Sequence, residues 1–217
     1  MKSEARIITI DGPSASGKGA LTKALAKFLN YRILDSGLLY RAYAYFYEIS
    51  LDSDEIKEKI TNLKIETKNN ELIVIFDGSD ITNNLRSEKT AKSASKLSAL
   101  KDTRSNLLGI QRALNNETGL IADGRDMGTV VFPNAGNKFF LTASAEIRAK
   151  RRFLELQNRG QEVNMRDLID DIEQRDLADQ SRELSPLLPA ADATVIDTSN
   201  MSLEEVFSFT KKLIKGN

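Results

Sequence analysis

The 217-residue sequence contains no cysteine and no histidine. Without cysteine the chain can form no disulfide, no thiolate nucleophile and no thiolate metal site, and without histidine it lacks the commonest general base and metal ligand. Any catalysis must therefore use carboxylates, lysine, arginine, hydroxyl groups, backbone amides or a weakly held metal ion.

Excess charge and long apolar segments are lacking as well. Lys plus Arg, 31, equals Asp plus Glu, 31, so no overall positive field favours nucleic acid or an anionic membrane. No segment approaches the roughly 20 apolar residues of a membrane span, and the charged start MKSEAR leads into an apolar stretch too short for a signal peptide. We expect a cytoplasmic protein that binds neither membranes nor nucleic acid.

Short β-branched runs alternate with helical patterns along most of the chain. Five runs predict strands, namely RIITI, YRILDSG, GLIADG, KFFLTAS and ATVIDTS. A capping box of Ser202 and Glu205 starts the clearest helix, at the C-terminal end. Strands that alternate with helices predict an α/β fold with a five-stranded parallel sheet covered on both faces.

One segment departs from this alternation. NLKIETKNNELIVIFDG alternates apolar and polar residues on either side of Asn69 and Asn70, which predicts a hairpin within a small sheet at about residues 63–84. We place this sheet in a mostly helical insertion that runs from about Gly37 to Asn116. The length of the chain suits one α/β domain with such an insertion.

A glycine-rich loop follows the first predicted strand. Gly12 to Lys18 has the spacing G-x-x-x-x-G-K and lies between a predicted strand and a predicted helix. In such a loop the backbone N–H groups and the helix N-terminus converge on anionic oxygens, and the lysine adds a charge near the β and γ phosphates. Gly19 and Ala20 follow, where a general phosphate loop has a hydroxyl residue on the metal ion.

Charged residues also follow the strands and occur at helical spacing. Asp11, Asp35, Asp123 and Asp126 stand at the ends of the first three predicted strands, and the carboxyl ends of parallel strands face one crevice. Arg175, Asp179 and Arg182 are spaced for one face of a helix, as are Arg148 and Arg152. Guanidinium groups in a site that excludes water can bind the oxygens of a phosphoryl group and stabilise its charge during transfer.

Four strings carry a family resemblance: ITIDGPSASGKG, LDSGLLYR, GLIADGRDMGTVVFP and PLLPAADA. Together they closely resemble the bacterial cytidylate kinases, in the nucleoside monophosphate kinase family of P-loop NTPases, over almost the whole chain. The resemblance implies ATP-dependent phosphorylation of CMP and dCMP to CDP and dCDP in pyrimidine metabolism, with Mg²⁺ as cofactor, by a monomer.

The resemblance also implies one three-layer P-loop kinase domain over residues 1–217. Its core would comprise residues 1–36, 117–157 and 183–217, with an acceptor-binding subdomain at about 37–116 and a lid at about 158–182.

The resemblance assigns roles residue by residue. ATP would be bound by Gly12, Pro13, Ser14, Ala15, Ser16, Gly17, Lys18, Gly19 and Ala20, with Arg148 and Arg152 as further candidates. CMP would be bound by Ser36, Ser95, Arg104 and Asp126 around the base, by Arg41, Arg125 and Arg182 at the phosphate, and by Arg175 and Asp179 at the ribose. Lys18, Arg125, Arg175 and Arg182 would be catalytic, and Asp35 and Asp123 would hold Mg²⁺ through water.

A carboxylate at Asp126 suits cytosine, whose N4 amino group donates where uracil has an acceptor. The chain departs from the family pattern at Ala20, where threonine is usual, and at Ala178 and Gln180, where arginines are frequent.

The sequence leaves three alternative functions to consider. A UMP or sugar-type kinase would share the fold. A GTPase-like switch would need a hydroxyl after Lys18 and an N-K-x-D motif, whereas the nearest string, NKFF, lacks the aspartate. A nucleic-acid module built on RAKRR is disfavoured by the neutral net charge and by the lack of interleaved aromatic residues.

Overall fold

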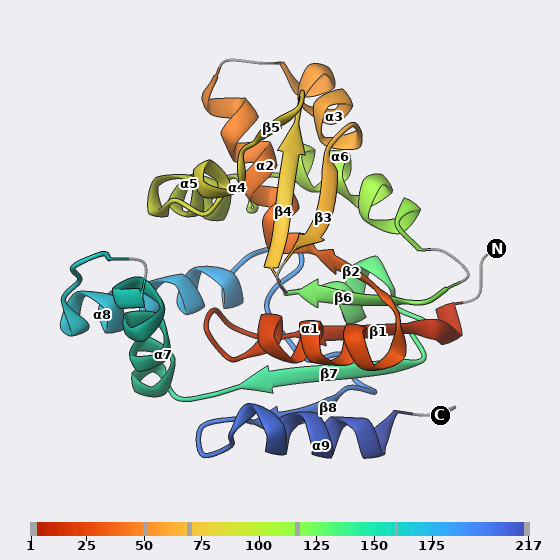
Figure 1. Ribbon diagram of the computed structural model, residues 1–217, viewed down its shortest axis with the longest axis vertical. Helices are drawn as coiled ribbons and strands as arrows, with labels where there is room; N and C mark the ends of the chain where they lie inside the picture. Colours follow the sequence, from red (N-terminus) through yellow and green to blue (C-terminus); the bar gives the residue numbers. More distant parts are fainter. Residues whose placement is uncertain (1–3, 50–51, 69–70, 116–117, 159, 215–217) are drawn as a thin grey trace. The chain divides into compact units, whose positions relative to one another are not determined.

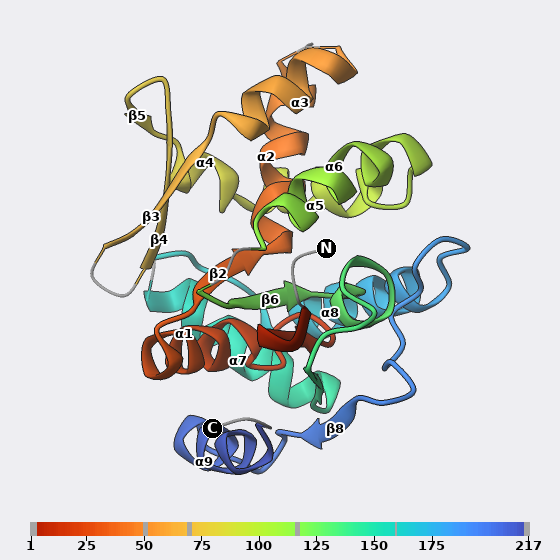
Figure 2. The ribbon, with the colours of Figure 1, turned by 90° about the vertical axis from the view of Figure 1, so that its right-hand side faces the viewer.

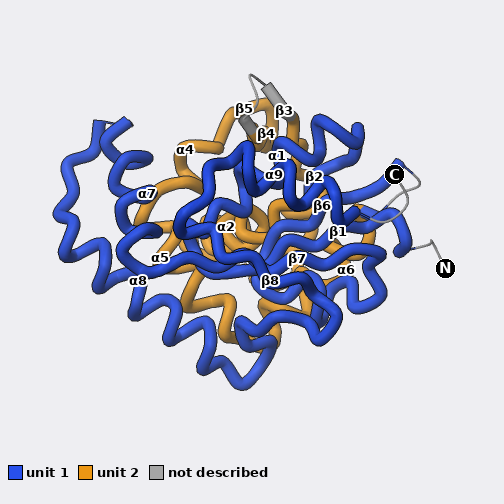
Figure 3. Tube along the Cα trace, turned by 90° about the horizontal axis from the view of Figure 1, so that it is seen from below, with its two compact units in different colours: residues 1–34, 115–217 blue, residues 35–114 orange. Residues whose placement is uncertain are grey.

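The computed structural model describes residues 4–49, 52–68, 71–115, 118–158 and 160–214 (Figure 1). Contacts along the chain divide it into two compact units, which Figure 3 colours separately. The larger unit comprises residues 1–34 and 115–217, and the smaller one comprises residues 35–114. Within the described ranges, no helix is long and apolar enough to cross a membrane.

The larger unit is built on a five-stranded sheet with the order β2-β6-β1-β7-β8 (Figure 1). Its strands are β1 (Ile7–Asp11), β2 (Arg32–Asp35), β6 (Leu120–Gly124), β7 (Asn137–Thr142) and β8 (Thr194–Asp197). Strand β1 pairs in parallel with β6 and β7, and β7 pairs in parallel with β8. The predicted α/β fold with a five-stranded parallel sheet is confirmed.

Two helices cover one face of this sheet. They are α1 (Lys18–Leu29) and α9 (Leu203–Leu213), which contact each other. Ile8 and Ile10 of β1 pack with Leu21 and Leu25 of α1 and with Val206 of α9. Each such buried side chain contributes about 1.5–3 kcal/mol relative to exposure. The predicted capping box of Ser202 and Glu205 at the start of α9 is confirmed.

Four further elements complete the described part of the larger unit. They are the 3₁₀ turn η1 (Glu4–Arg6), the π-helix η2 (Met127–Val131), α7 (Ala145–Asn158) and α8 (Met165–Gln180). Helices α7 and α8 pack against each other. Thr9 and Asp11 alternate with Ile8 and Ile10 along β1, and Asp11 contacts η2 on the face opposite α1.

The smaller unit combines helices with a three-stranded antiparallel sheet (Figure 2). Its elements are α2 (Ser36–Glu48), α3 (Ser53–Thr61), β3 (Lys64–Lys68), β4 (Glu71–Phe76), β5 (Ser79–Asp80), α4 (Thr82–Leu85), α5 (Glu88–Leu97) and α6 (Lys101–Ala113). Strands β3 and β4 pair antiparallel, which confirms the small sheet, while its third strand, β5, was not predicted. The turn expected at Asn69 and Asn70 lies outside the described residues.

Candidate active site

The glycine-rich loop connects the end of β1 to the start of α1, as its spacing predicts. Gly12 has a φ of 143°, and a Cβ atom there would lie 2.0 Å from the carbonyl oxygen of Leu141. Gly17 has a φ of 96° and forms the N-cap of α1, whose first residue is Lys18. Glycine is required at Gly12 by the contact with Leu141 and favoured at Gly17 by the positive φ, and without these side chains the loop backbone can approach a ligand closely with its N–H groups.

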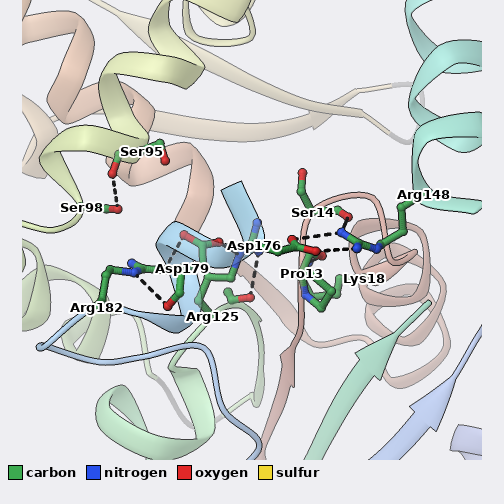
Figure 4. Close-up of polar contacts among 11 residues, drawn as sticks. Pro13, Ser14, Lys18, Ser95, Ser98, Arg125, Arg148, Asp176, Asp179 and Arg182 are labelled. Carbon is green, nitrogen blue, oxygen red and sulfur yellow. Dashed lines mark hydrogen bonds and ion pairs between the residues drawn. The ribbon is translucent and has the colours of Figure 1, made fainter. Parts of the chain in front are cut away.

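Lys18 is a buried cation, with 6 % of its surface exposed. Its Nζ donates a hydrogen bond to the carbonyl oxygen of Pro13 at 2.7 Å (Figure 4). Burial, and after it the positive charge of Arg125, lower the pKa of Lys18 to about 7, while Asp123 and Asp11 oppose the shift. An incoming phosphate would favour the charged form of this lysine.

Arg125, which follows β6, and Arg182 both bind the carboxylate of Asp179 on α8 (Figure 4). Nε of Arg125 lies 2.9 Å from Oδ2 of Asp179, and a terminal nitrogen of Arg182 lies 2.6 Å from Oδ1. Burial raises the pKa of Asp179, but the charges of Arg125 and Arg182 outweigh this effect and hold it below its usual value. Arg175, also on α8, contributes to the positive field at both Asp179 and Lys18.

The structure therefore brings together Lys18, Arg125, Arg175 and Arg182, the four residues predicted to be catalytic. One part of the prediction is wrong: Arg182 does not lie on a helix face, because α8 ends at Gln180. Arg182 instead turns back, and its Nε also donates to the carbonyl oxygen of Asp179 at 3.3 Å. A buried carboxylate that binds two guanidinium groups orients both of them.

Asp126 is the N-cap of the π-helix η2 and is buried. The backbone of η2 is closed by bonds from Val131 N to Asp126 O at 3.1 Å and from Phe132 N to Met127 O at 2.7 Å. The sequence carried no signal for this element, since five residues are too few to show an apolar period. π-Helical turns are frequent at functional sites.

Arg148 on α7 is held beside the glycine-rich loop (Figure 4). Its terminal nitrogens bind the two carboxylate oxygens of Asp176 at 3.0 and 2.5 Å, and one of them lies 3.4 Å from the carbonyl oxygen of Ser14. Arg152 pairs instead with Glu155 of its own helix at 2.7 Å. Arg148, one of the two predicted donor-side arginines, is thus tied to the loop.

A functional candidate that the sequence reasoning missed is Arg151. Its terminal nitrogens donate to the carbonyl oxygen of Thr198 at 2.6 Å and to its hydroxyl at 3.0 Å, and that hydroxyl donates to the carbonyl oxygen of Ser16 at 3.0 Å. Arg151 thereby helps to line a mainly apolar hollow of about 210 Å³ next to the loop. The other lining residues are Ser16, Gly17, Ala20, Leu141, Thr198, Met201, Leu203 and Val206. The string RAKRR contains Arg151, but the helical spacing used to choose candidate residues pointed to Arg148 and Arg152 instead.

In the smaller unit, Ser36 begins α2 and is buried, and its Oγ accepts a hydrogen bond from Nε2 of Gln111 at 2.8 Å. Asp35 is the N-cap of the same helix and accepts from the backbone N–H of Leu38 at 2.9 Å. Part of the Asp35 carboxylate is therefore engaged in capping α2.

The other predicted residues of the smaller unit lie on three helices. Arg41 on α2 donates to the carbonyl oxygen of Leu85 at 3.0 Å. The guanidinium of Arg104 on α6 lies 5.7 Å from the ring centroid of Tyr40. Ser95 on α5 accepts a hydrogen bond at its carbonyl oxygen from Ser98, at 2.8 Å.

Comparison with known proteins gives concordant results. The model of the family described as cytidylate kinase matches residues 8–215. A cytidylate kinase of Yersinia pestis (strain Pestoides F) is 45 % identical over 212 residues, which cover 95 % of this chain and 92 % of that protein. The cytidylate kinase of Yersinia pseudotuberculosis serotype O:1b (strain IP 31758) has the same identity and coverage.

The likeness extends to solved structures. An uncharacterized protein from Eubacterium ventriosum ATCC 27560 aligns with a TM-score of 0.52 over 97 % of this chain and 99 % of that chain, at 14 % identity. At this identity the match shows a shared fold alone.

Proposed function

The chain belongs to the cytidylate kinase family, and on this premise we propose that it transfers the γ-phosphoryl group of ATP to CMP or dCMP. The products are ADP and CDP or dCDP. The observation that supports this function most directly is the group of cations in the unit that carries the phosphate loop: Arg125, Arg175 and Arg182 surround the buried Asp179, and Arg125 and Arg175 also act on Lys18.

In the reaction, an oxygen of the CMP phosphate forms a bond to the γ phosphorus of ATP, and the bond from that phosphorus to the bridging oxygen of ADP breaks. The acceptor is already an oxyanion, so the enzyme needs no strong general base. Positioning and neutralisation of charge are the main requirements. We assign neutralisation to Lys18, Arg125, Arg175 and Arg182, two of which Asp179 holds in fixed orientation.

For the donor, we assign the triphosphate to the loop from Gly12 to Ala20. Arg148 supports this assignment, because Asp176 fixes its guanidinium beside the carbonyl oxygen of Ser14. The apolar hollow lined by Arg151 has the size and the lining to accept a flat base next to the loop. We therefore propose it for the base of ATP.

For the acceptor, we propose that Asp126 receives the amino group of cytosine. Ser36, Ser95 and Arg104 would contact the base and its neighbouring groups, Arg41, Arg125 and Arg182 the phosphate, and Arg175 and Asp179 the ribose. The division into core, acceptor-binding subdomain and a lid at about residues 158–182 is part of the same proposal, as are a cytoplasmic location and a monomeric state.

Magnesium suits this chemistry if the nucleotide supplies most of its ligands. Among the residues that the structure describes, no group of three or more acidic side chains could hold a metal ion. The Asp123 carboxylate lies beside the first turn of α1, 3.7 Å from the position of a Cβ atom at Gly19. Carboxylate and phosphate oxygens with retained waters are what Mg²⁺ prefers, and the ion would neutralise charge on the phosphates. We propose Asp123, and Asp35 with it, as ligands through water.

The function is tested by measuring ADP release from MgATP with a panel of nucleoside monophosphates. We expect CMP and dCMP to accelerate release strongly and UMP much less, while Lys18→Met abolishes the acceleration. Lack of acceleration by every member of the panel would overturn the kinase assignment. A preference for UMP would point to a different kinase on the same fold.

A further inference from the structure

Asp11, the last residue of β1, is a buried carboxylate with no role in the reaction described above. Only 5 % of its surface is exposed. Its Oδ1 accepts a hydrogen bond from the backbone N–H of Met127 at 2.9 Å, and its Oδ2 accepts one from Gly128 at 2.8 Å. One carboxylate therefore binds two successive amides that lie 116 and 117 residues away in the sequence.

These amides are the first two of the π-helix η2. N–H groups at a helix start have no partner within the helix, and an aspartate at the N-cap ordinarily accepts from them. The N-cap here is Asp126, whose side chain makes no such bond. Asp11 caps the helix in its place, so the Asp126 carboxylate is not committed to capping.

Close packing around Gly128 also fixes the backbone of η2. A Cβ atom at Gly128 would lie 2.9 Å from Oγ1 of Thr9, 3.2 Å from Cδ of Lys138 and 3.3 Å from Oδ2 of Asp11. All three distances are tighter than an ordinary van der Waals contact, so η2 rests directly on β1 and β7. A change in the Asp11 carboxylate must therefore be transmitted to the backbone of η2 rather than absorbed by a gap.

We propose that Asp11 is a positioning residue which, by holding the start of η2, sets the places of Arg125 and Asp126 for the acceptor nucleotide. The inference rests on the proposed function, since it concerns the two residues assigned to the phosphate and the base of CMP. Asp11 also directly precedes Gly12. The Asp11 side chain therefore connects the start of the glycine-rich loop to the segment that we assign to the phosphate and the base of CMP.

The hydrogen bonds between Asp11 and η2 should also depend on pH, because the surroundings of Asp11 shift its pKa. Burial raises its pKa to about 6, against the lowering effect of the Gly128 and Met127 amides. The charged groups that face it are Asp126 at the start of η2, which raises the pKa, and Lys18 of α1, which lowers it. Lys138 of β7 lies near Gly128 through its methylene groups, while its ammonium binds Pro133 and Asp192. Protonation would replace one acceptor oxygen by a donor.

The decisive variant is Asp11→Asn, which keeps the size of the side chain but turns an NH₂ group toward one of the two amides. We expect kcat/KM for CMP to fall about 10- to 100-fold, mainly through KM, as a displacement of about 1 Å in a positioned group can produce. The ratio of kcat/KM for CMP to that for UMP should move toward one.

The matched control is Thr9→Ser on the same strand. Serine keeps the hydroxyl oxygen that packs against Gly128 and removes only a methyl group, so KM for CMP and the CMP to UMP ratio should stay unchanged. A role for Asp11 in stability alone would lower the melting temperature of Asp11→Asn and leave both quantities as in the unaltered protein. That result, with an active unaltered enzyme, would refute the positioning role. An unaltered enzyme that fails to use CMP would refute the proposed function instead.

A second measurement needs no variant and no substrate. In ¹⁵N-labelled protein without nucleotide, the amide signals of Met127 and Gly128 should shift together between pH 5 and 8, with one midpoint near 6. Gly109, an exposed glycine of α6, provides the reference amide. If the two amides do not titrate with a common midpoint, Asp11 does not hold them as described, and the inference fails even if Asp11→Asn cannot be folded.

Discussion

A lysine with a pKa near neutrality makes nucleotide binding a proton-linked event. Burial and Arg125 lower the pKa of Lys18 to about 7, whereas the phosphates of a bound nucleotide would raise it again. In free protein at pH 8, about 0.9 of this lysine is neutral, given its pKa of about 7. Binding of MgATP at pH 8 should therefore take up close to one proton, and affinity should fall as pH rises above 7.

Calorimetry in two buffers with different ionisation enthalpies measures this uptake directly. Lys18→Arg is the control, because a guanidinium stays charged throughout the range, and its binding should be accompanied by little proton uptake. Equal uptake by both proteins would show that the protons go to a different group.

A variant at Ala20 tests whether the glycine-rich loop needs a hydroxyl group in the first turn of α1, the helix that follows it. Ala20 is exposed and lines the hollow beside the loop, whereas we assign the phosphates to the buried Lys18 and the loop amides. Ala20→Thr should therefore change kcat by less than tenfold, about 1.4 kcal/mol in the barrier. Steady-state kinetics at saturating MgATP and CMP would check this. A larger gain would mean that a hydroxyl at this position contributes to holding the metal ion.

At the scale of elements, η2 depends on the absence of a side chain at Gly128. Gly128→Ala would place its Cβ atom 2.9 Å from Oγ1 of Thr9 and 3.3 Å from Oδ2 of Asp11, so η2 must move. We expect a loss of about 1–3 kcal/mol in the free energy of unfolding, typical of overpacking, and a raised KM for CMP. Chemical denaturation and kinetics measure the two effects.

Gly109 provides the opposite case in the same chain. It lies within α6, and nothing surrounds the position of its Cβ atom within 4 Å among the described residues. Gly109→Ala should stabilise the protein by about 0.4–1 kcal/mol, because alanine loses less backbone entropy in a helix. Stabilisation by Gly128→Ala to the same extent would contradict the close packing of η2.

These elements also show what a sequence can predict. The strands and the glycine loop have local signals: β1 is a β-branched run, and Gly12 and Gly17 have positive φ angles that favour glycine. The capping box of α9 lies within four consecutive residues. Each of these features depends on neighbours in the chain, so pattern and spacing suffice to predict it.

The features that escaped prediction depend on distant partners. Asp11 and the η2 amides are more than 100 residues apart, and Arg125 meets Asp179 across 54 residues. Arg182 appeared helical because its spacing from Asp179 fits a helix, yet α8 ends before it and the contact is made by a turn. Arg151 is distinguished by its contact with Thr198, 47 residues away. Such contacts follow from the tertiary fold, which no local pattern contains.

At the scale of the whole molecule, the chain has no net charge, yet its fold clusters basic side chains into a positively charged site. The 31 basic and 31 acidic residues balance, but the fold gathers Arg125, Arg175 and Arg182 around one carboxylate, Asp179, and brings Arg125 and Arg175 near Lys18 as well. Such a cluster is costly in the free protein, because like charges repel at low dielectric. Nucleotides relieve this repulsion, so binding should stabilise the entire fold.

The melting temperature measures that stabilisation. A ligand at 100 times its Kd adds about 2.7 kcal/mol, which for a chain of this size corresponds to a rise of roughly 5–10 °C. CMP should produce such a rise at concentrations where UMP produces much less, since uracil would place an acceptor against the buried carboxylate of Asp126, which we propose for the base. In Asp126→Asn, whose amide can donate to that acceptor, the difference between the two nucleotides should shrink. An undiminished preference for CMP in this variant would show that the base is selected elsewhere in the protein.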